Sequence, residues 1–162
     1  MPDGIKKIFQ TGLTDVKDTD LEGVGTIRFE GSKIYKWVVL TNATSTVTCT
    51  AGDVLGYRLA QVANSVVVSD NTDSQTKPIG AGVVVTTDTV AGVAGTSYYL
   101  WVQIKGAATA LKDILGSTPA DGDALFLSTT DLTLTLATVA DDPVVAFADD
   151  DSAQLIVCDF PF

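Results

Sequence analysis

The chain has 162 residues and a formal net charge of −10, from twenty acidic and ten basic residues. With 46% hydrophobic and 19% charged residues, it is too apolar to be disordered and long enough for one domain with a buried core. The acidic balance repels phosphate backbones, so we expect no nucleic-acid partner. No stretch approaches the roughly 18 consecutive apolar residues of a transmembrane helix, and the N-terminus lacks the apolar centre of a signal peptide, so we expect no membrane partner.

The first part of the chain, residues 1–24, is predicted to be an N-terminal arm, and residues 25–162 a single β domain. Ile5, Ile8 and Phe9 lie among polar residues near the start of the arm, and a charged stretch follows them. This pattern is typical of an apolar tip on an acidic, poorly structured tether. The residues are equally compatible with an apolar tip that packs on the surface of its own domain.

The β domain is predicted to begin with a hairpin. Two β-prone runs, Thr26–Glu30 and Lys33–Thr41, flank Gly31-Ser32. Glycine at the first of two loop residues favours a type II′ turn. Three more strands are expected before the middle of the chain, at Thr44–Thr50, Val54–Ala60 and Asn64–Asp70.

The stretch Pro78–Gly106 is predicted to be the centre of the sheet. It contains a strand at Ala81–Thr87, a turn at Asp88–Thr96 and a second strand at Tyr98–Lys105. The second strand alternates between an aliphatic face and a face that carries Trp101. This period-two alternation is typical of a half-buried strand.

The last third of the chain contains one helix candidate and four more strands. The helix candidate is Ala107–Gly116, where apolar residues recur at helical spacing. Strands are expected at Ala124–Ser128, at Leu132–Leu136, after Pro143 and at Ala153–Phe160, with an acidic turn at Asp149–Asp151. The whole pattern predicts an all-β fold: a compact antiparallel β-sandwich or barrel of about ten short strands, with an extended N-terminal arm and at most one short helix.

One sequence pattern occurs twice. Gly52-Asp53 and Gly122-Asp123 each open a strand, and each is followed by a turn, a second strand and a proline. Two passes of one pattern indicate either an internal duplication or the turn chemistry that antiparallel sheets share. We favour shared turn chemistry.

The sequence offers no catalytic constellation, and we expect no enzyme, no cofactor and no bound metal. Histidine is absent, so neither a Ser-His-Asp nor a Cys-His arrangement can form. Paired acids such as Asp121 and Asp123 are a weak calcium signal, because acidic turns of this kind are ordinarily solvated. Cys49 and Cys158 stand in apolar contexts that suit buried free thiols, and a disulfide between them stays open.

Apolar residues near both ends of the chain are the candidate partner interface. Phe160 and Phe162 lie in the C-terminal tail and need a dry environment, either on a neighbouring subunit or on the chain's own wall. The full candidate set is Ile5, Ile8, Phe9, Phe160 and Phe162. Trp37 and Trp101 are expected in the core, because tryptophan is usually largely buried, with a partner contact as the alternative.

The order of motifs resembles that of a known class of proteins. An Ala51-Gly52-Asp53 turn opens a strand, and Ile-Gly-Ala-Gly-Val at Ile79–Val83 and Trp-Val-Gln-Ile-Lys-Gly at Trp101–Gly106 follow it. A second Gly-Asp opening, a Pro-Val-Val-Ala-Phe-Ala strand and a closing apolar strand complete the series. Over roughly Gly25 to Phe160, this order resembles the small capsid decoration (cement) proteins of tailed bacteriophages.

The resemblance implies a structural virion protein that binds the outer surface of a phage head and stabilises contacts between major capsid proteins. It implies synthesis in the host cytoplasm, the major capsid protein as partner, a homo-oligomer with a trimer favoured, and no catalytic residues. Two alternatives stay open. One is another virion β domain, from a tail, head fibre or receptor-binding protein; the other is a carbohydrate-binding or adhesin-like β module.

Overall fold

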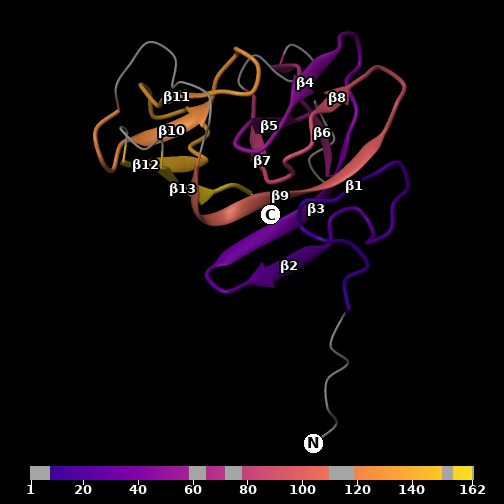
Figure 1. Ribbon diagram of the computed structural model, residues 1–162. Coiled ribbons are helices and arrows are strands. Elements are labelled where there is room, and N and C mark those ends of the chain that lie inside the picture. Colours follow the sequence, from indigo (N-terminus) through magenta and orange to yellow (C-terminus); the bar gives the residue numbers. More distant parts are fainter. Residues whose placement is uncertain (1–7, 59–64, 72–77, 110–118, 151–154, 162) are drawn as a thin grey trace, which may run out of the picture.

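The computed structural model describes residues 8–58, 65–71, 78–109, 119–150 and 155–161. The chain is nearly all β, with 47% in strands and 1% in helix, which confirms the predicted class (Figure 1). Within the described residues, thirteen strands form one eleven-stranded sheet and a separate two-stranded ribbon.

Five strands of the large sheet close into a barrel. In order around the barrel they are β3 (Lys33–Leu40), β6 (Val66–Val68), β5 (Val54–Tyr57), β7 (Gly80–Val84) and β9 (Tyr98–Thr109), and β9 pairs again with β3. The predicted barrel is confirmed with one difference. Strands β3 and β6 run parallel, whereas we expected an antiparallel sheet throughout.

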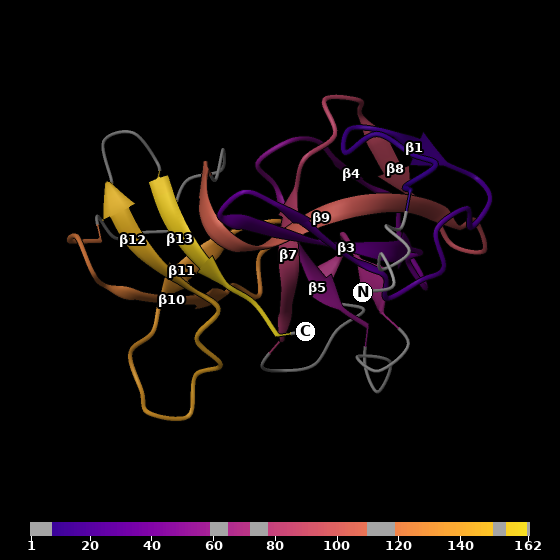
Figure 2. The same cartoon turned by 90° about the horizontal axis from the view of Figure 1, so that it is seen from below.

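Strand β9 is the centre of the fold, as the sequence predicted. It pairs with β1 (Val16–Lys17), β3, β7 and β13 (Leu155–Asp159). Its first part belongs to the barrel, and its last five residues pair with β13. The strand curves between these two parts (Figure 2), and it continues past Gly106, where we expected it to end.

The remaining strands extend the sheet on both sides of the barrel. On one side lie β10 (Ala124–Leu127), β11 (Leu134–Leu136), β12 (Ala146–Asp150) and β13, in the order β11-β10-β12-β13-β9. On the other side β2 (Ile27–Glu30) forms the predicted hairpin with β3, and Glu30 pairs with Lys33 across a two-residue loop. In that loop Gly31 has a φ of 60° and Ser32 has no positive φ, as a type II′ turn requires.

The predicted turn Asp88–Thr96 contains a strand instead. Strand β8 (Val90–Gly92) pairs with β4 (Val47–Cys49) in the separate ribbon. The buried amide of Asn42 holds this ribbon, since its Nδ2 donates to the Gly92 carbonyl at 2.9 Å and to Ser69 Oγ at 3.1 Å. These bonds join residues distant in sequence, so local propensity did not indicate the strand.

The first residues of the helix candidate, Ala107–Thr109, are strand, so this part of the prediction is wrong. They pair with Leu155–Val157 of β13, and this ladder overrides the local preference of alanine for helix. Residues 110–118 lie outside the described part of the chain. The acidic turn expected at Asp149–Asp151 is also partly strand, because β12 continues to Asp150.

Both cysteines are free and buried. Cys49 is 1% exposed and Cys158 is 3% exposed, and both belong to the main hydrophobic core. Burial raises the pKa of the Cys158 thiol to about 12. The structure therefore supports the prediction of buried thiols over that of a disulfide.

The two Gly-Asp turns have the same hydrogen-bond pattern. In each turn the glycine N–H donates to a carbonyl of the opposing strand, and the N–H of that same opposing residue donates back to the aspartate carbonyl. The bonds are Gly52 N to Val84 O (2.9 Å), Val84 N to Asp53 O (2.8 Å), Gly122 N to Ala148 O (2.8 Å) and Ala148 N to Asp123 O (2.9 Å). Both glycines have a φ of 88°.

The likeness extends from the turns to the strands around them. We call β5, β6, β7 and β9 the first unit, and β10, β11, β12 and β13 the second unit. Their order in the sheet is β6-β5-β7-β9-β13-β12-β10-β11, so the second unit repeats the first in reverse about the β9–β13 pair. Shared turn chemistry explains only the turns. The matching strand order favours the internal duplication that the sequence analysis ranked second.

The bend of β9 depends on Gly106. It has a φ of 90°, and a Cβ at this position would lie 2.8 Å from the Ser32 carbonyl oxygen. Gly106→Ala is expected to lower the free energy of unfolding by about 2–4 kcal/mol, from left-handed strain and the backbone clash together.

Gly95→Ala is the matched control for this variant. Gly95 also has a positive φ, 76°, but nothing lies within 4 Å of its Cβ position, so only the strain of about 1 kcal/mol applies. Urea unfolding of both variants measures the difference. Equal losses would show that the contact between the hairpin and the bend is unimportant.

Candidate partner interface

The N-terminal arm covers an aromatic cluster on the outside of the barrel. Tyr35 and Trp37 on β3 and Trp101 on β9 form the centre of this arm cluster, and both tryptophans are 0% exposed. The partly buried residues packed against them are Phe9, Leu13, Val24, Val85 and Tyr99. The tryptophans are therefore buried, as expected, and the side chains that cover them include three from the arm.

Aromatic and cationic contacts hold the arm in place. The rings of Phe9 and Trp101 meet edge to face, with centroids 5.5 Å apart. The guanidinium of Arg28 lies 4.7 Å from the centroid of Phe9, and the rings of Trp37 and Trp101 lie 5.2 Å apart. Such contacts add to the free energy gained by burying the rings.

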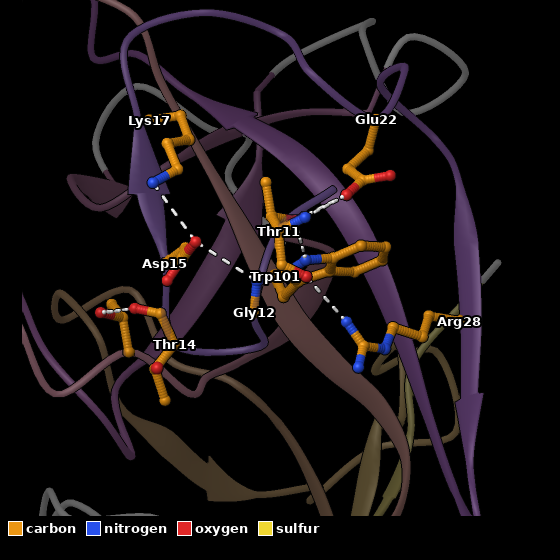
Figure 3. Close-up of polar contacts among 9 residues, drawn as sticks. Thr11, Gly12, Thr14, Asp15, Lys17, Glu22, Arg28 and Trp101 are labelled. Atoms are coloured by element: carbon orange, nitrogen blue, oxygen red, sulfur yellow. Dashed lines mark hydrogen bonds and ion pairs between the residues drawn. The ribbon is translucent and has the colours of Figure 1, made fainter. Parts of the chain in front are cut away.

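A network of hydrogen bonds centred on Thr11 also holds the arm on the barrel (Figure 3). Trp101 Nε1 donates to Thr11 Oγ1 at 2.9 Å, and Thr11 Oγ1 donates to Glu22 Oε1 at 2.8 Å. The same carboxylate oxygen accepts from Thr11 N at 2.7 Å, and Arg28 Nη1 donates to the Thr11 carbonyl at 2.9 Å. Thr11 and Glu22 are both buried, so these charge-assisted bonds are protected from water.

Backbone pairing continues the attachment along the arm. Val16 and Lys17 of β1 pair with Leu100 and Tyr99 of β9, and Thr86 Oγ1 donates to the Thr14 carbonyl at 2.7 Å. The segment from residue 8 onward has little regular structure, but it is fixed on the barrel rather than being a loose tether. The proposed boundary between residues 24 and 25 stays a prediction.

The five candidate interface residues do not form one surface. Ile8 is 86% exposed, whereas the neighbouring Phe9 is packed on Trp101. Phe160 is 1% exposed and belongs to the main core. It therefore packs within its own chain, one of the two expected environments, and is not available to a partner. Ile5 and Phe162 lie outside the described residues.

Sequence reasoning missed several exposed apolar side chains. Phe29 on β2 is 69% exposed, Val139 is 57% exposed, Phe147 on β12 is 40% exposed and Val157 on β13 is 41% exposed. Phe147 and Val157 are directly paired. The signal was present, because both residues occupy outward positions of strands whose alternate residues, Ala146, Ala148, Ile156 and Cys158, are buried.

A lysine side chain is buried in the core of the barrel. Lys36 is 4% exposed, and its Nζ donates to the Tyr57 hydroxyl at 2.9 Å. Burial lowers the pKa of Lys36 and raises the pKa of Tyr57 to about 12. Both side chains are buried and satisfy each other through this hydrogen bond.

The described residues show no arrangement for metal binding or membrane crossing. Among them, no group of three or more His, Cys, Asp or Glu side chains is placed to hold a metal ion. Within the same residues, no helix is long and apolar enough to span a membrane. Comparisons with known proteins add nothing to the resemblance, because no family model, curated protein or solved structure matches this chain.

Removal of the Glu22 carboxylate should release the arm. Glu22→Ala leaves the buried Thr11 N–H and hydroxyl without their acceptor, which we expect to weaken arm closure by about 2–3 kcal/mol. Hydrogen exchange at residues 9–17 should accelerate by about the corresponding factor of 30–150, while exchange in β3 and β9 is unchanged. Asp18→Ala, which removes the same charge from an exposed side chain, is the control. Equal effects of the two variants would contradict a specific role of Glu22.

Replacement of Lys36 by an apolar side chain should stabilise the barrel. In Lys36→Met, a buried ammonium with one neutral hydrogen-bond partner is removed, and we expect the free energy of unfolding at pH 7 to rise by about 1–3 kcal/mol. Because burial lowers the pKa of Lys36, the wild-type penalty is full below the folded pKa and disappears as pH rises toward the ordinary value of 10.5.

The difference between Lys36→Met and wild type should therefore shrink between neutral pH and pH 10.5. Chemical denaturation at several pH values measures this difference. Titration of Cys158 affects both proteins alike and cancels to first order. A difference that grows with pH would contradict the assignment of the penalty to the lysine.

Proposed function

We propose that this chain is a structural protein of a phage virion that binds the outside of the head and reinforces contacts between major capsid proteins. The observation that carries the proposal is the position of the arm. Its residues from Phe9 onward are locked on the barrel, while Ile8, directly before them, is 86% exposed. A rigid barrel thus presents an apolar side chain from a fixed point, which suits a contact with a neighbouring subunit of an assembly.

The chemistry of the described residues supports a binding role over a catalytic one. The sequence has no histidine, and the buried Lys36–Tyr57 pair is enclosed in the core. A carbohydrate-binding module would be expected to present exposed tryptophan rings, but both tryptophans are 0% exposed, and the exposed rings of Phe29 and Phe147 have no hydrogen-bonding group. These features favour the virion reading over the adhesin-like alternative.

The net charge of −10 fits a protein on the outside of a head. An acidic chain is repelled by packaged DNA and by other copies at non-specific contacts, so it stays soluble until it meets its specific site. Many copies on a symmetric lattice gain avidity even where each contact is weak. Together with the order of motifs, these properties support a decoration protein more than a tail component.

The copy number of the chain in virions tests this proposal. In purified particles of the phage that encodes it, we expect a ratio of order one copy per major capsid protein, because a cement protein occupies sites that repeat over the whole head lattice. Quantitative gel densitometry against the major capsid protein measures the ratio. A few copies per hundred would place the chain in the tail or at a vertex, and absence from the particles would overturn the proposal.

A further inference from the structure

The two units of the fold differ in how well one pair of equivalent residue rows is covered. In the first unit Val54 pairs with Val83, and Val83 pairs with Gln103. In the second unit the equivalent row is Ala124, Phe147 and Val157, paired in the same way. The row continues to Ala107 on β9, which pairs with Val157 and is exposed.

The first row is closed and the second is open. Val54, Val83 and Gln103 are 1%, 2% and 3% exposed, whereas Phe147 and Val157 are 40% and 41% exposed. The apolar residues of the second row therefore form an uncovered strip across four strands, which we call the open strip: Ala124, Phe147, Val157 and Ala107. An exposed apolar strip on a sheet face is typical of a binding surface.

The chain itself shows which kind of segment covers such a face. Val85 lies two residues after Val83, and Trp101 lies two residues before Gln103. Both belong to the arm cluster and are covered by Phe9 and its neighbours. Counted from Phe147 and Val157, the equivalent positions in the second unit are Asp149 and Leu155, although a bulge between Ala148 and Asp150 puts Asp150 opposite Leu155. An extended segment with apolar side chains lies on the first unit, and the second unit lacks one among the described residues.

Charge indicates which segment would complete the second unit. Residues 107–162 contain ten aspartates and one lysine, whereas residues 1–106 contain ten acidic and nine basic residues. Asp149, two residues after Phe147, is exposed on the same face. Asp159 lies two residues after Val157, where Lys105 pairs with it at 2.8 Å. The open strip thus favours a segment that combines apolar and basic residues.

The sequence Ile5-Lys6-Lys7-Ile8 is such a segment. It places two lysines between two isoleucines directly ahead of the locked Phe9. It reaches the open strip of its own chain poorly, because four residues span at most about 14 Å. The strip begins six residues beyond Trp101 on β9, about 20 Å of strand, and Phe147 lies two further strand spacings of about 4.8 Å away.

We propose that the open strip binds the segment Ile5–Ile8 of a second copy of this chain. Each copy then covers the second unit of its neighbour with the extension of the arm that covers its own first unit. The contact is head-to-tail, so it closes into a ring such as a trimer when the rotation between copies permits. The inference deepens the proposed function only in its expectation of a homo-oligomer and needs no capsid.

Cross-linking between two single-cysteine variants tests the contact. Ile5→Cys and Phe147→Cys proteins are mixed under mild oxidation, and disulfide-linked heterodimers are measured by mass spectrometry. The native cysteines are buried and remain unreactive. We expect heterodimers at about tenfold or more the yield obtained when Ile5→Cys is mixed with Val139→Cys, the control at an exposed site of the same unit.

Charge exchange supplies an independent measurement. Lys6→Glu/Lys7→Glu should weaken self-association of the full chain about tenfold or more in sedimentation velocity, and adding Asp149→Lys should restore part of it. Equal weakening without restoration, or an oligomer that neither change affects, would overturn the proposal. So would a wild-type chain that is monomeric at about 100 µM, since a specific contact of this kind should hold well below that concentration.

Other occupants give different outcomes. A double variant Ile5→Cys/Phe147→Cys that links only within one chain overturns the proposal in favour of the chain's own arm. Absence of any link, with Phe147→Ser weakening attachment to phage heads, overturns it in favour of the capsid and leaves the proposed function intact. Heterodimers from a chain that is absent from virions support this inference and overturn the proposed function.

Discussion

The fold depends on one strand that pairs with two different parts of the large sheet. Strand β9 gives one end to the barrel through β3 and β7 and the other end to β13. A straight strand of twelve residues would carry both sets of partners in one plane. The positive φ of Gly106 and the three bonds from Gln103 Nε2 to the carbonyls of residues 105, 106 and 107 allow the strand to change direction while its backbone groups stay paired.

Although β9 pairs with strands of both units, the chain covers the outer surface of the two units to different extents. The barrel closes on itself, and its outer aromatic face is sealed by a segment from the N-terminal end of the chain. The second unit joins the large sheet through β9, and its outer face keeps the alternation of a sheet that meets solvent or a partner. A duplicated unit whose first copy is covered and whose second copy is open is a simple origin for the proposed binding surface.

Local patterns in the sequence predicted the parts of the fold that local chemistry determines. The hairpin at Gly31-Ser32 follows from turn chemistry, and the two faces of β9 follow from period-two alternation, with Leu100 in the main core and Trp101 in the arm cluster. The barrel class followed from many short β-prone runs. These features need only neighbouring residues to be specified.

Features that depend on distant contacts were not predictable in the same way. Strand β8 depends on the amide of Asn42, fifty residues from the carbonyl that it binds. The strand at Ala107–Thr109 depends on β13, and the parallel β3–β6 pair depends on barrel closure. For the candidate interface, residue type identified apolar side chains but not their accessibility, so Phe160 was selected although it is buried and Phe147 was missed although it is exposed.

The distribution of charge gives the acidic composition a more specific meaning than solubility. A uniformly acidic surface would only repel other copies. Here residues 1–106 are nearly balanced, and almost all of the net charge of −10 lies in residues 107–162. Such a chain repels copies of itself when second units face each other and attracts them when an arm with Lys6 and Lys7 faces a second unit. In the proposed contact between copies, this charge distribution favours a head-to-tail arrangement over a face-to-face one, which is the geometry of closed rings and extended lattices.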